Sequence, residues 1–404
     1  FQICLLLLSI SSAISFLVTR KKTMGVRGTW GLYAAGLGAV AVLALPEFQK
    51  SAFLQPFRIQ RIMDATFKGV EKFRTHLARS SNLILWRDDP NTSVGVGSSP
   101  KEGPEVSRSI YINGKSDGNS RADYTTAAML GHLAGLLPLS PKRTAIIGFG
   151  TGIAIGTLAQ YSEVDSVDVL EISPALLANK HLFDPYNDNA SKNPKVRFHE
   201  MDAFRFLLGT TEQFDAIMSE PSNPWVAGIE NLYSKEFYRL SREKLNPGGV
   251  FVQWIHTYSF NKDLIKLVLR TMRSEFPYVS VYELKGADFA LVGSVNPIEL
   301  EQLQRAAQRT KEPAVRSLFA RLDIHNPETI FALEVMSPEV SKDVSKGEGL
   351  HRLESPRLSH QAAKAFFLGT EAEIHQLKRE PRNFYRTLKD SHLVRFMEGR
   401  DPSR

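Results

Sequence analysis

The chain has 404 residues, which is enough for two or three domains. Apolar residues make up 43% and charged residues 23%, so a disordered, collagen-like or coiled-coil chain is excluded. The net charge of +7, spread over the whole chain, does not by itself indicate a lipid or nucleic-acid partner. A single cysteine, Cys4, excludes a disulfide framework and a cysteine-based zinc site.

The amino-terminal part of the chain contains two uncharged apolar runs, QICLLLLSISSAISFLV at 2–18 and TWGLYAAGLGAVAVLAL at 29–45. Both are close to the lower limit of about 17 residues for a membrane-spanning helix. Three glycines in the second run suit close helix packing in lipid. We therefore predict a transmembrane helical hairpin over residues 1–46. Because the chain begins at Phe1 rather than Met, we expect the hairpin to end a longer membrane domain.

Alternatives remain open for this region. Residues 2–18 could be a signal peptide or anchor, although a basic start and a cleavage site are not evident, and both runs could be buried soluble helices. Basic residues at 20–27 and at 50–61 give opposite orientation signals. Residues 47–79 are basic and amphipathic, which predicts either an interfacial helix on anionic lipid or a linker helix packed on its own domain.

Residues 80–140 predict a small β region followed by a helix. The runs NLILWR, TSVGVGS and RSIYING alternate in the manner of short strands. Asp88-Asp89-Pro90 and Asn113-Gly114 are turn residues that predict hairpins. The helix is expected over residues 124–137.

A βαβ unit is predicted next. RTAIIGFGTG at 143–152 is a short apolar strand that runs into a glycine-rich turn, and a helix at 153–160 leads to a second strand, SVDVLEI. Gly148, Gly150 and Gly152 let the backbone turn tightly and approach a ligand closely. Glu171 ends the second strand, where it can accept hydrogen bonds from ribose hydroxyls. NAD, FAD and SAM enzymes all share such a loop.

Three further strands narrow the choice of ligand. Asp202 follows KVRFHEM, Glu220 ends FDAIMSE, and NPGGVFVQWI forms a fifth strand, a pattern that fits a SAM methyltransferase-like topology. Ligands of such sheets bind at the carboxyl ends of the strands, so Glu171, Asp202 and Glu220 are expected to face one site. Asp202 can bind an adenine amino group, cap the following helix, or do both.

The sequence resembles the spermidine synthase (polyamine aminopropyltransferase) family, in particular a bacterial branch in which the synthase-like domain follows multi-span membrane helices. The resemblance covers roughly residues 80–295. It is carried by INGK at 112–115, GFGTG at 148–152, LEI at 170–172, MDA at 201–203, SEPSNPWVAGIENLYSKEFY at 219–238 and PGGVFVQW at 247–254.

The resemblance implies an α/β fold: a doubly wound, seven-stranded, SAM methyltransferase-like sheet over residues 141–295, beside the small N-terminal β region. A β-hairpin at 276–292 is expected to close the sheet, and a helical extension follows over 296–404. The implied co-substrate is decarboxylated SAM, or SAM, without a metal. The implied partners are a small amine such as putrescine, membrane lipid and a second copy of the chain, without nucleic acid. The catalytic domain is expected on the cytoplasmic side of a bacterial inner membrane.

Carried over residue by residue, the resemblance implies two groups of site residues. The nucleoside group is Gly148, Gly150, Thr151, Gly152, Glu171, Ile172, Asp202 and Ala203. The catalytic group is Glu220, Asn223 and Tyr233.

The amine side departs from the family pattern. The family has aspartates at the positions of Thr151, Glu220 and Asn223, and a Tyr-His-Glu run where this chain has Thr126-Ala127-Ala128. Glu220 can still accept a proton from an attacking amine. Asp117 and Asp123 lie near the family's substrate gate and are candidates for a replacement anchor. Loss of a carboxylate at position 223 favours a small or monocationic acceptor.

Two other functions stay open. With Thr151 in the loop, the carboxylate of ordinary SAM is repelled less, which is compatible with a SAM-dependent methyltransferase. The altered amine side is also compatible with a non-catalytic nucleoside or polyamine sensor coupled to a membrane domain. His132, His256 and His351 lack metal-ligand spacing and are expected to be structural. LHRLESPR at 350–357 resembles a segment that follows the synthase domain in the membrane-fused branch.

Overall fold

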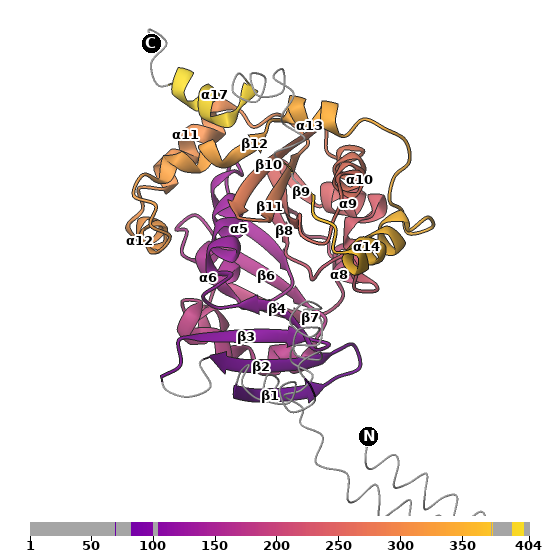
Figure 1. Ribbon diagram of the computed structural model, residues 1–404. Coiled ribbons are helices and arrows are strands. Elements are labelled where there is room, and N and C mark those ends of the chain that lie inside the picture. The colour runs from indigo at the N-terminus through magenta and orange to yellow at the C-terminus, as the bar shows by residue number, and fades with distance from the viewer. Residues whose placement is uncertain (1–68, 70–81, 100–103, 373, 375–389, 400–404) are drawn as a thin grey trace, which may run out of the picture. The chain divides into compact units, whose positions relative to one another are not determined.

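The computed structural model describes residues 69, 82–99, 104–372, 374 and 390–399 (Figure 1). The predicted transmembrane hairpin and almost all of the basic segment 47–79 lie outside these residues. Among the described residues, no helix has the length and hydropathy needed to cross a membrane.

Four antiparallel strands form a small sheet in the order β1-β2-β3-β4. Their bounds are β1 Asn82–Asp88, β2 Ser93–Ser99, β3 Ser107–Ile112 and β4 Lys115–Asn119. The predicted β region is confirmed, with one strand more than the sequence indicated. Asn113 and Gly114 have φ values of 51° and 81°, the left-handed backbone that Asn-Gly turns favour, and this turn returns β3 into β4.

A larger mixed sheet has the order β12-β10-β11-β9-β8-β5-β6-β7. The strands are β5 Arg143–Ile147, β6 Ser166–Glu171, β7 Val196–Glu200, β8 Phe214–Ser219, β9 Leu245–His256, β10 Tyr278–Lys285, β11 Asp288–Ser294 and β12 Glu334–Met336. Strands β9, β8, β5, β6 and β7 run parallel, and the β10–β11 hairpin adds antiparallel strands beside β9. The predicted βαβ unit and closing hairpin are confirmed.

Residues 141–295 supply seven strands of this sheet, as predicted, and an eighth strand joins from outside that range. The eighth strand, β12, comes from the extension that was predicted to be helical, and it pairs with β10 at the sheet edge. Buried polar contacts fix this three-residue strand: the Glu334 carboxylate accepts hydrogen bonds from Ser280 Oγ (2.7 Å) and from the His392 backbone N–H (2.6 Å).

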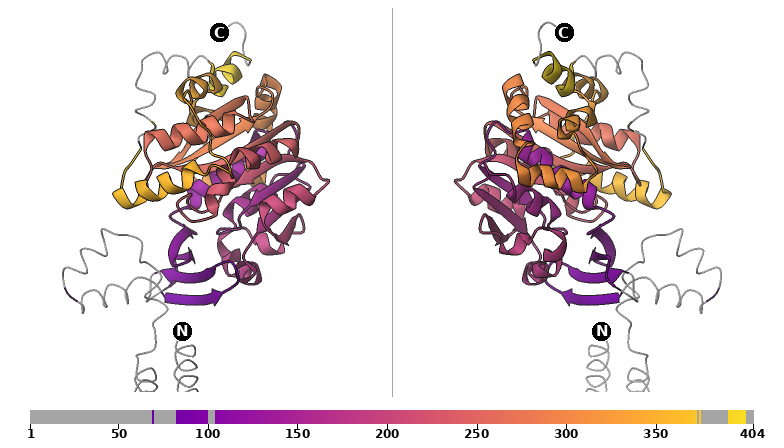
Figure 2. Two further views of the ribbon diagram at one scale, coloured as in Figure 1. Left: turned by 90° about the vertical axis from the view of Figure 1, so that its right-hand side faces the viewer. Right: turned by 90° about the vertical axis from the view of Figure 1, so that its left-hand side faces the viewer.

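Helices cover both faces of the large sheet (Figure 2). Along β5 and β8 the side chains alternate between the two cores: Ile146 and Met218 belong to one, Ile147 and Ile217 to the other. The helices are α5 Tyr124–Leu136, α6 Ile153–Ala159, α7 Pro174–Ala178, α8 Ala203–Gly209, α9 Lys235–Glu243, α10 Lys262–Arg273, α11 Leu300–Arg309, α12 Pro313–Arg321, α13 Pro338–Val344, α14 Arg357–Leu368 and α17 His392–Glu398. The residues of α5, α6, α11, α12 and α17 join the first core, and those of α8, α9, α10, α13 and α14 join the second.

The strand order reverses between β5 and β8, the place where open α/β sheets bind ligands. The small sheet contacts the loop after β6, a neighbour of β5. Asn91 Nδ2 donates to the Ile172 carbonyl (2.8 Å), and Ser173 Oγ donates to the Asp89 carboxylate (2.5 Å). The two sheets therefore enclose the carboxyl ends of the parallel strands.

Candidate active site

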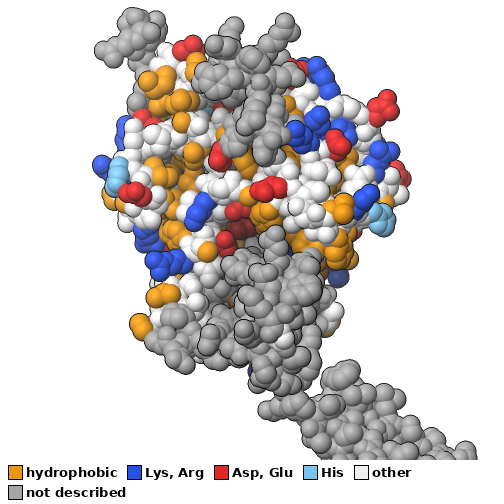
Figure 3. All heavy atoms as spheres, in the orientation of Figure 1, with side chains coloured by type: hydrophobic (Ala, Val, Ile, Leu, Met, Phe, Trp, Pro, Cys, Tyr) orange, Lys and Arg blue, Asp and Glu red, His pale blue; other side chains and the backbone are white. Residues whose placement is uncertain are grey.

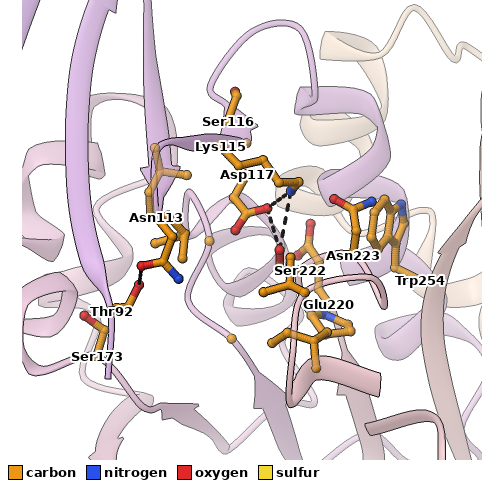
Figure 4. A pocket seen from close by; sticks show the side chains of 18 of the residues that line it. Thr92, Asn113, Lys115, Ser116, Asp117, Ser173, Glu220, Ser222, Asn223 and Trp254 are labelled. Carbon is orange, nitrogen blue, oxygen red and sulfur yellow. Dashed lines mark hydrogen bonds and ion pairs between the residues drawn. The ribbon is translucent and has the colours of Figure 1, made fainter. Parts of the chain in front are cut away.

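A cavity of about 1110 Å³ lies between the small sheet and the carboxyl ends of the parallel strands. Its wall includes residues of β3 and β4, the loops after β5, β6, β7 and β8, and the start of β11. Figure 4 labels side chains from several of these segments, among them Asp117 of β4, Ser173 after β6 and Glu220 after β8. The cavity is large enough for a nucleoside and a second small molecule, since ligand pockets commonly measure about 300–1,000 Å³.

The glycine-rich loop forms one part of this wall. Gly148 has a φ of 91°, and a Cβ there would lie 2.9 Å from the Glu220 carbonyl oxygen, so a side chain is excluded by both conformation and space. Gly148, Gly150 and Thr151 line the cavity. Gly152 does not; it precedes α6 with a φ of 73° and turns the chain into that helix.

Glu171 connects this loop to the end of β6. Its buried carboxylate accepts hydrogen bonds from the backbone N–H of Phe149 (3.0 Å) and of Ser173 (2.8 Å). Burial raises the pKa of Glu171, and these backbone hydrogen bonds oppose the increase. Glu171 and the adjacent Ile172 both border the cavity, so one carboxylate fixes the loop and faces the ligand space.

Asp202 and Ala203 border the same end of the cavity. The Asp202 carboxylate accepts a hydrogen bond from the Arg205 backbone N–H (3.0 Å) and caps α8, which is one of the roles that the sequence left open. Its second oxygen is compatible with a ligand contact, because a carboxylate can accept several hydrogen bonds.

Glu220 follows β8 and also lines the cavity, with its carbonyl against Gly148 of the glycine-rich loop. Its backbone N–H donates to the Ile147 carbonyl (3.1 Å), which ties it to the end of β5. Burial, followed by the negative charges of Asp123 and Asp288, raises the pKa of Glu220 to about 8. A carboxyl group with this pKa can gain or lose a proton near neutral pH, as a general base must.

Polar groups surround Glu220. Asn223 is buried, and its Nδ2 donates to the Tyr258 hydroxyl oxygen (3.2 Å). Asp117 accepts from Ser222 Oγ (2.8 Å) and forms an ion pair with Lys115, whose Nζ also lies 3.4 Å from Ser222 Oγ (Figure 4). Lys115 therefore balances the charge of Asp117.

Two carboxylates complete this end of the cavity. Asp123 was predicted; its side chain accepts from the Asn119 backbone N–H (2.7 Å). Asp288 was missed by the sequence analysis. It accepts from Thr126 Oγ1 (2.9 Å) and Trp254 Nε1 (3.2 Å), and burial raises its pKa. Its only sequence signal is its place at the start of the second strand of the closing hairpin.

Tyr258 is a second cavity residue that the sequence analysis missed.

Near the junction of the two sheets, Figure 3 shows acidic side chains gathered beside hydrophobic ones.

The structure differs from the prediction at Tyr233. This side chain is fully buried, and its hydroxyl donates to the Trp254 backbone carbonyl (3.2 Å). It does not line the cavity, and it contacts the backbone of Trp254, which does. The physical reason is that it belongs to the 3₁₀ helix Ile229–Tyr233, which buries this ring against β9.

Part of the chain, including residues of this site, is similar to known proteins. Residues 124–285 match the model of the spermine/spermidine synthase domain. A polyamine aminopropyltransferase of Oceanobacillus iheyensis is 30% identical over 169 residues, which cover 41% of this chain and 33% of the relative. Another, of Aeropyrum pernix, is 25% identical over 177 residues, which cover 43% and 56%. The chain thus spans between a third and somewhat over half of the length of these two relatives.

A solved structure gives the same fold. A crystal structure of spermidine synthase in complex with the transition-state analogue AdoDATO matches with a TM-score of 0.53 and 18% identity, over 65% of this chain and 88% of that one. This likeness confirms the predicted α/β fold.

Proposed function

We propose, from the premise that residues 124–285 belong to the spermine/spermidine synthase domain family, that this chain transfers an aminopropyl group from decarboxylated SAM to an amine. The observation that carries the proposal is that one cavity is lined by two groups of residues. We call the part lined by Glu171 and Asp202 the first, or nucleoside, end, and the part lined by Glu220, Asp123 and Asp288 the second, or acceptor, end. The glycine-rich loop contacts both groups, because the Phe149 N–H donates to Glu171 and Gly148 lies against the Glu220 carbonyl.

The first end suits the nucleoside of decarboxylated SAM. Carboxylates at the ends of adjacent parallel strands can accept hydrogen bonds from ribose hydroxyls and from an adenine amino group, and a glycine loop lets the backbone approach. The sulfonium and the terminal ammonium of this co-substrate are cations, which the carboxylates of the second end attract. The structural relative crystallised with AdoDATO supports this assignment.

The second end suits an amine. An alkyl amine resembles lysine and is mostly protonated at neutral pH, so a carboxylate must attract the cation and another must take the proton before attack. Glu220, with its pKa raised to about 8, is the candidate proton acceptor. Asp288 and Asp123 are the candidate charges that hold the ammonium.

The reaction then needs no further co-reactant. The neutral acceptor nitrogen forms a bond to the aminopropyl carbon attached to sulfur, while the carbon–sulfur bond breaks and its electron pair stays on sulfur. Methylthioadenosine leaves as a neutral thioether. Glu220 takes one proton from the acceptor ammonium before this attack and later passes it to water, and the new secondary ammonium keeps the positive charge that sulfur loses, so atoms and charge balance.

The test uses the full chain, purified in mild detergent and supplied with decarboxylated SAM or SAM and a panel of amines. Mass spectrometry reads the products. We expect an aminopropylated amine and methylthioadenosine, and we expect Glu220→Gln to lower the rate by about 10²–10⁴-fold. Glu301→Gln is the matched control, because this carboxylate of α11 is 65% exposed and pairs with Arg305 on its own helix. Methylated products, or nucleoside binding without any product, would overturn the proposal.

We also propose that the two apolar runs at 2–18 and 29–45 anchor the chain in a bacterial inner membrane, with the catalytic domain in the cytoplasm. Their length and lack of charge support this location. Carbonate extraction of cells that express the full chain tests it: the protein should stay with the membrane pellet. Release into the supernatant would contradict an integral anchor.

A further inference from the structure

A segment outside the matched domain contributes to the cavity. The domain match ends at residue 285, yet Phe366 of α14 lines the cavity together with Trp225 and Tyr258. The ring of Phe366 stacks on that of Trp225 with centroids 4.9 Å apart and an angle of 28° between the planes. The ring of Trp225 in turn meets that of Tyr258 edge to face at 6.1 Å.

The start of α14 is fixed by His351. This fully buried side chain donates from Nε2 to the Glu230 carbonyl (2.8 Å) and accepts at Nδ1 from the Leu358 backbone N–H (3.2 Å). The His351 backbone N–H donates to Thr271 Oγ1 of α10 (3.0 Å). Burial lowers the pKa of His351, which keeps the ring neutral, as one donating and one accepting nitrogen require.

The body and end of α14 are fixed as well. Leu358, Ala362 and Ala365 are buried in one core with residues of α10. Gly369 ends the helix with a φ of 59°, a conformation that favours glycine, and the chain then turns back toward the cavity. Glu371 pairs with Tyr258 in an antiparallel bridge, and the Ala372 N–H donates to the Thr257 carbonyl (3.0 Å).

These contacts attach residues 350–372, which include α14, to the acceptor end of the cavity. Tyr258 accepts the hydrogen bond from Asn223, three residues after Glu220. Aromatic rings and carboxylates thus border the same space, an arrangement that holds an ammonium by charge and its methylene chain by apolar contact.

We propose that residues 350–372 form the outer wall of the acceptor subsite and that Phe366, stacked on Trp225, selects short aliphatic amines. The inference rests on the proposed function and adds a residue that determines which amines fit. The methylenes lie against the two rings while the ammonium faces Glu220 and Asp288. The ring of Phe366 limits the length of chain that fits. His351 is a positioning residue, because it acts through the start of α14.

The experiment compares Phe366→Ala with Phe367→Ala in the full chain. Phe367 is the matched control: it is the next residue on the same helix, it is 75% exposed and it does not line the cavity. The probes are n-butylamine, putrescine and 1,7-diaminoheptane, each with decarboxylated SAM. For Phe366→Ala we expect KM for putrescine to rise about tenfold while the long diamine gains relative to it, and kcat to change little. Phe367→Ala should match the wild type.

Two further measurements keep the inference falsifiable. Phe366→Leu keeps most of the volume and should give a smaller shift in the same direction, and thermal unfolding shows whether each variant is folded. Calorimetric binding of the three amines in the presence of methylthioadenosine separates the two proposals. If the wild type binds amines but transfers nothing, the transfer reaction fails, and the length preference is still read from binding. If folded Phe366→Ala and Phe366→Leu keep the wild-type preference for short over long amines, Phe366 does not form the wall of the acceptor subsite, whether or not the chain is active.

Discussion

The pH dependence of transfer is the sharpest consequence of the geometry around Glu220. Burial and the charges of Asp123 and Asp288 raise the pKa of Glu220 to about 8. If this carboxylate accepts the amine proton, only its ionised form is active. A pKa of about 8 leaves roughly a tenth of the groups ionised at pH 7 and about half at pH 8. We therefore expect kcat/KM to rise about fivefold between pH 7 and pH 8 and to level off above pH 9.

Asp288→Asn changes this profile in a defined direction. Removal of the Asp288 charge removes one of the causes that raise the pKa of Glu220, so the rising limb moves to lower pH. The gain in ionised Glu220 at pH 7 cannot exceed about tenfold, because about a tenth is ionised already. The measured quantity is the pH at which kcat/KM rises. The maximal kcat/KM is not used, because loss of Asp288 also weakens attraction for the amine and lowers it.

The assay measures kcat/KM for product formation from pH 6 to pH 10 in the wild type, Asp288→Asn and Glu301→Gln. Titration of the free amine adds a second limb near pH 10, common to all three proteins. The control Glu301→Gln should reproduce the wild-type limb near pH 8. Two outcomes would refute the assignment of Glu220 as the base. One is a wild-type kcat/KM that rises at pH 4–5, and the other is a rise in kcat/KM that stays at the same pH in Asp288→Asn.

Three further variants test other parts of the site. Glu220→Gln should leave stability unchanged near pH 4 and raise the melting temperature at pH 9. The folded pKa of Glu220, about 8, lies above the unfolded value of 4.5, so the wild type loses stability as pH rises from about 4.5 to 8. Equal melting temperatures of the two proteins at pH 9 would contradict the buried carboxyl group. Gly148→Ala should cost about 1–3 kcal/mol in urea unfolding and weaken nucleoside binding, whereas Gly209→Ala, with open space at its Cβ, should not. Asn223→Asp adds a carboxylate beside Tyr258 and should lower KM for putrescine about tenfold without a similar gain for n-butylamine; an equal change for both amines would exclude a diamine contact there.

The meeting of four strand-end features in one cavity could be predicted because all of them follow parallel strands. The carboxyl ends of β5, β6, β7 and β8 meet at one edge, so a glycine loop, Glu171, Asp202 and Glu220 at those places had to converge. The Asn113-Gly114 turn was readable for a similar reason, since two adjacent positive φ values are a local property of these residue types.

The acceptor end depends on contacts between distant segments, which a single sequence does not show. Asp288 reaches the cavity because β11 pairs with β9, and Phe366 reaches it because the extension folds back over α10. Tyr233 was carried over from the family resemblance, and the sequence carries no signal for the direction of its side chain. The strand β12 has three residues, too few to show any periodicity.

The distribution of charge in the cavity leads to one more prediction. The whole chain has a net charge of +7, but Lys115 balances Asp117, so the carboxylates of Asp123, Asp288 and Glu220 make the acceptor end acidic. An ammonium that enters this space favours the ionised form of Glu220, and the bound acceptor therefore lowers the pKa of its own base. Since kcat/KM reports the free enzyme and kcat the loaded one, the rising limb of kcat should lie at lower pH than that of kcat/KM. The same pH profiles, measured at saturating and at low amine concentration, give both limbs. Coincident limbs would mean that the ammonium binds too far from Glu220 for this carboxylate to take its proton.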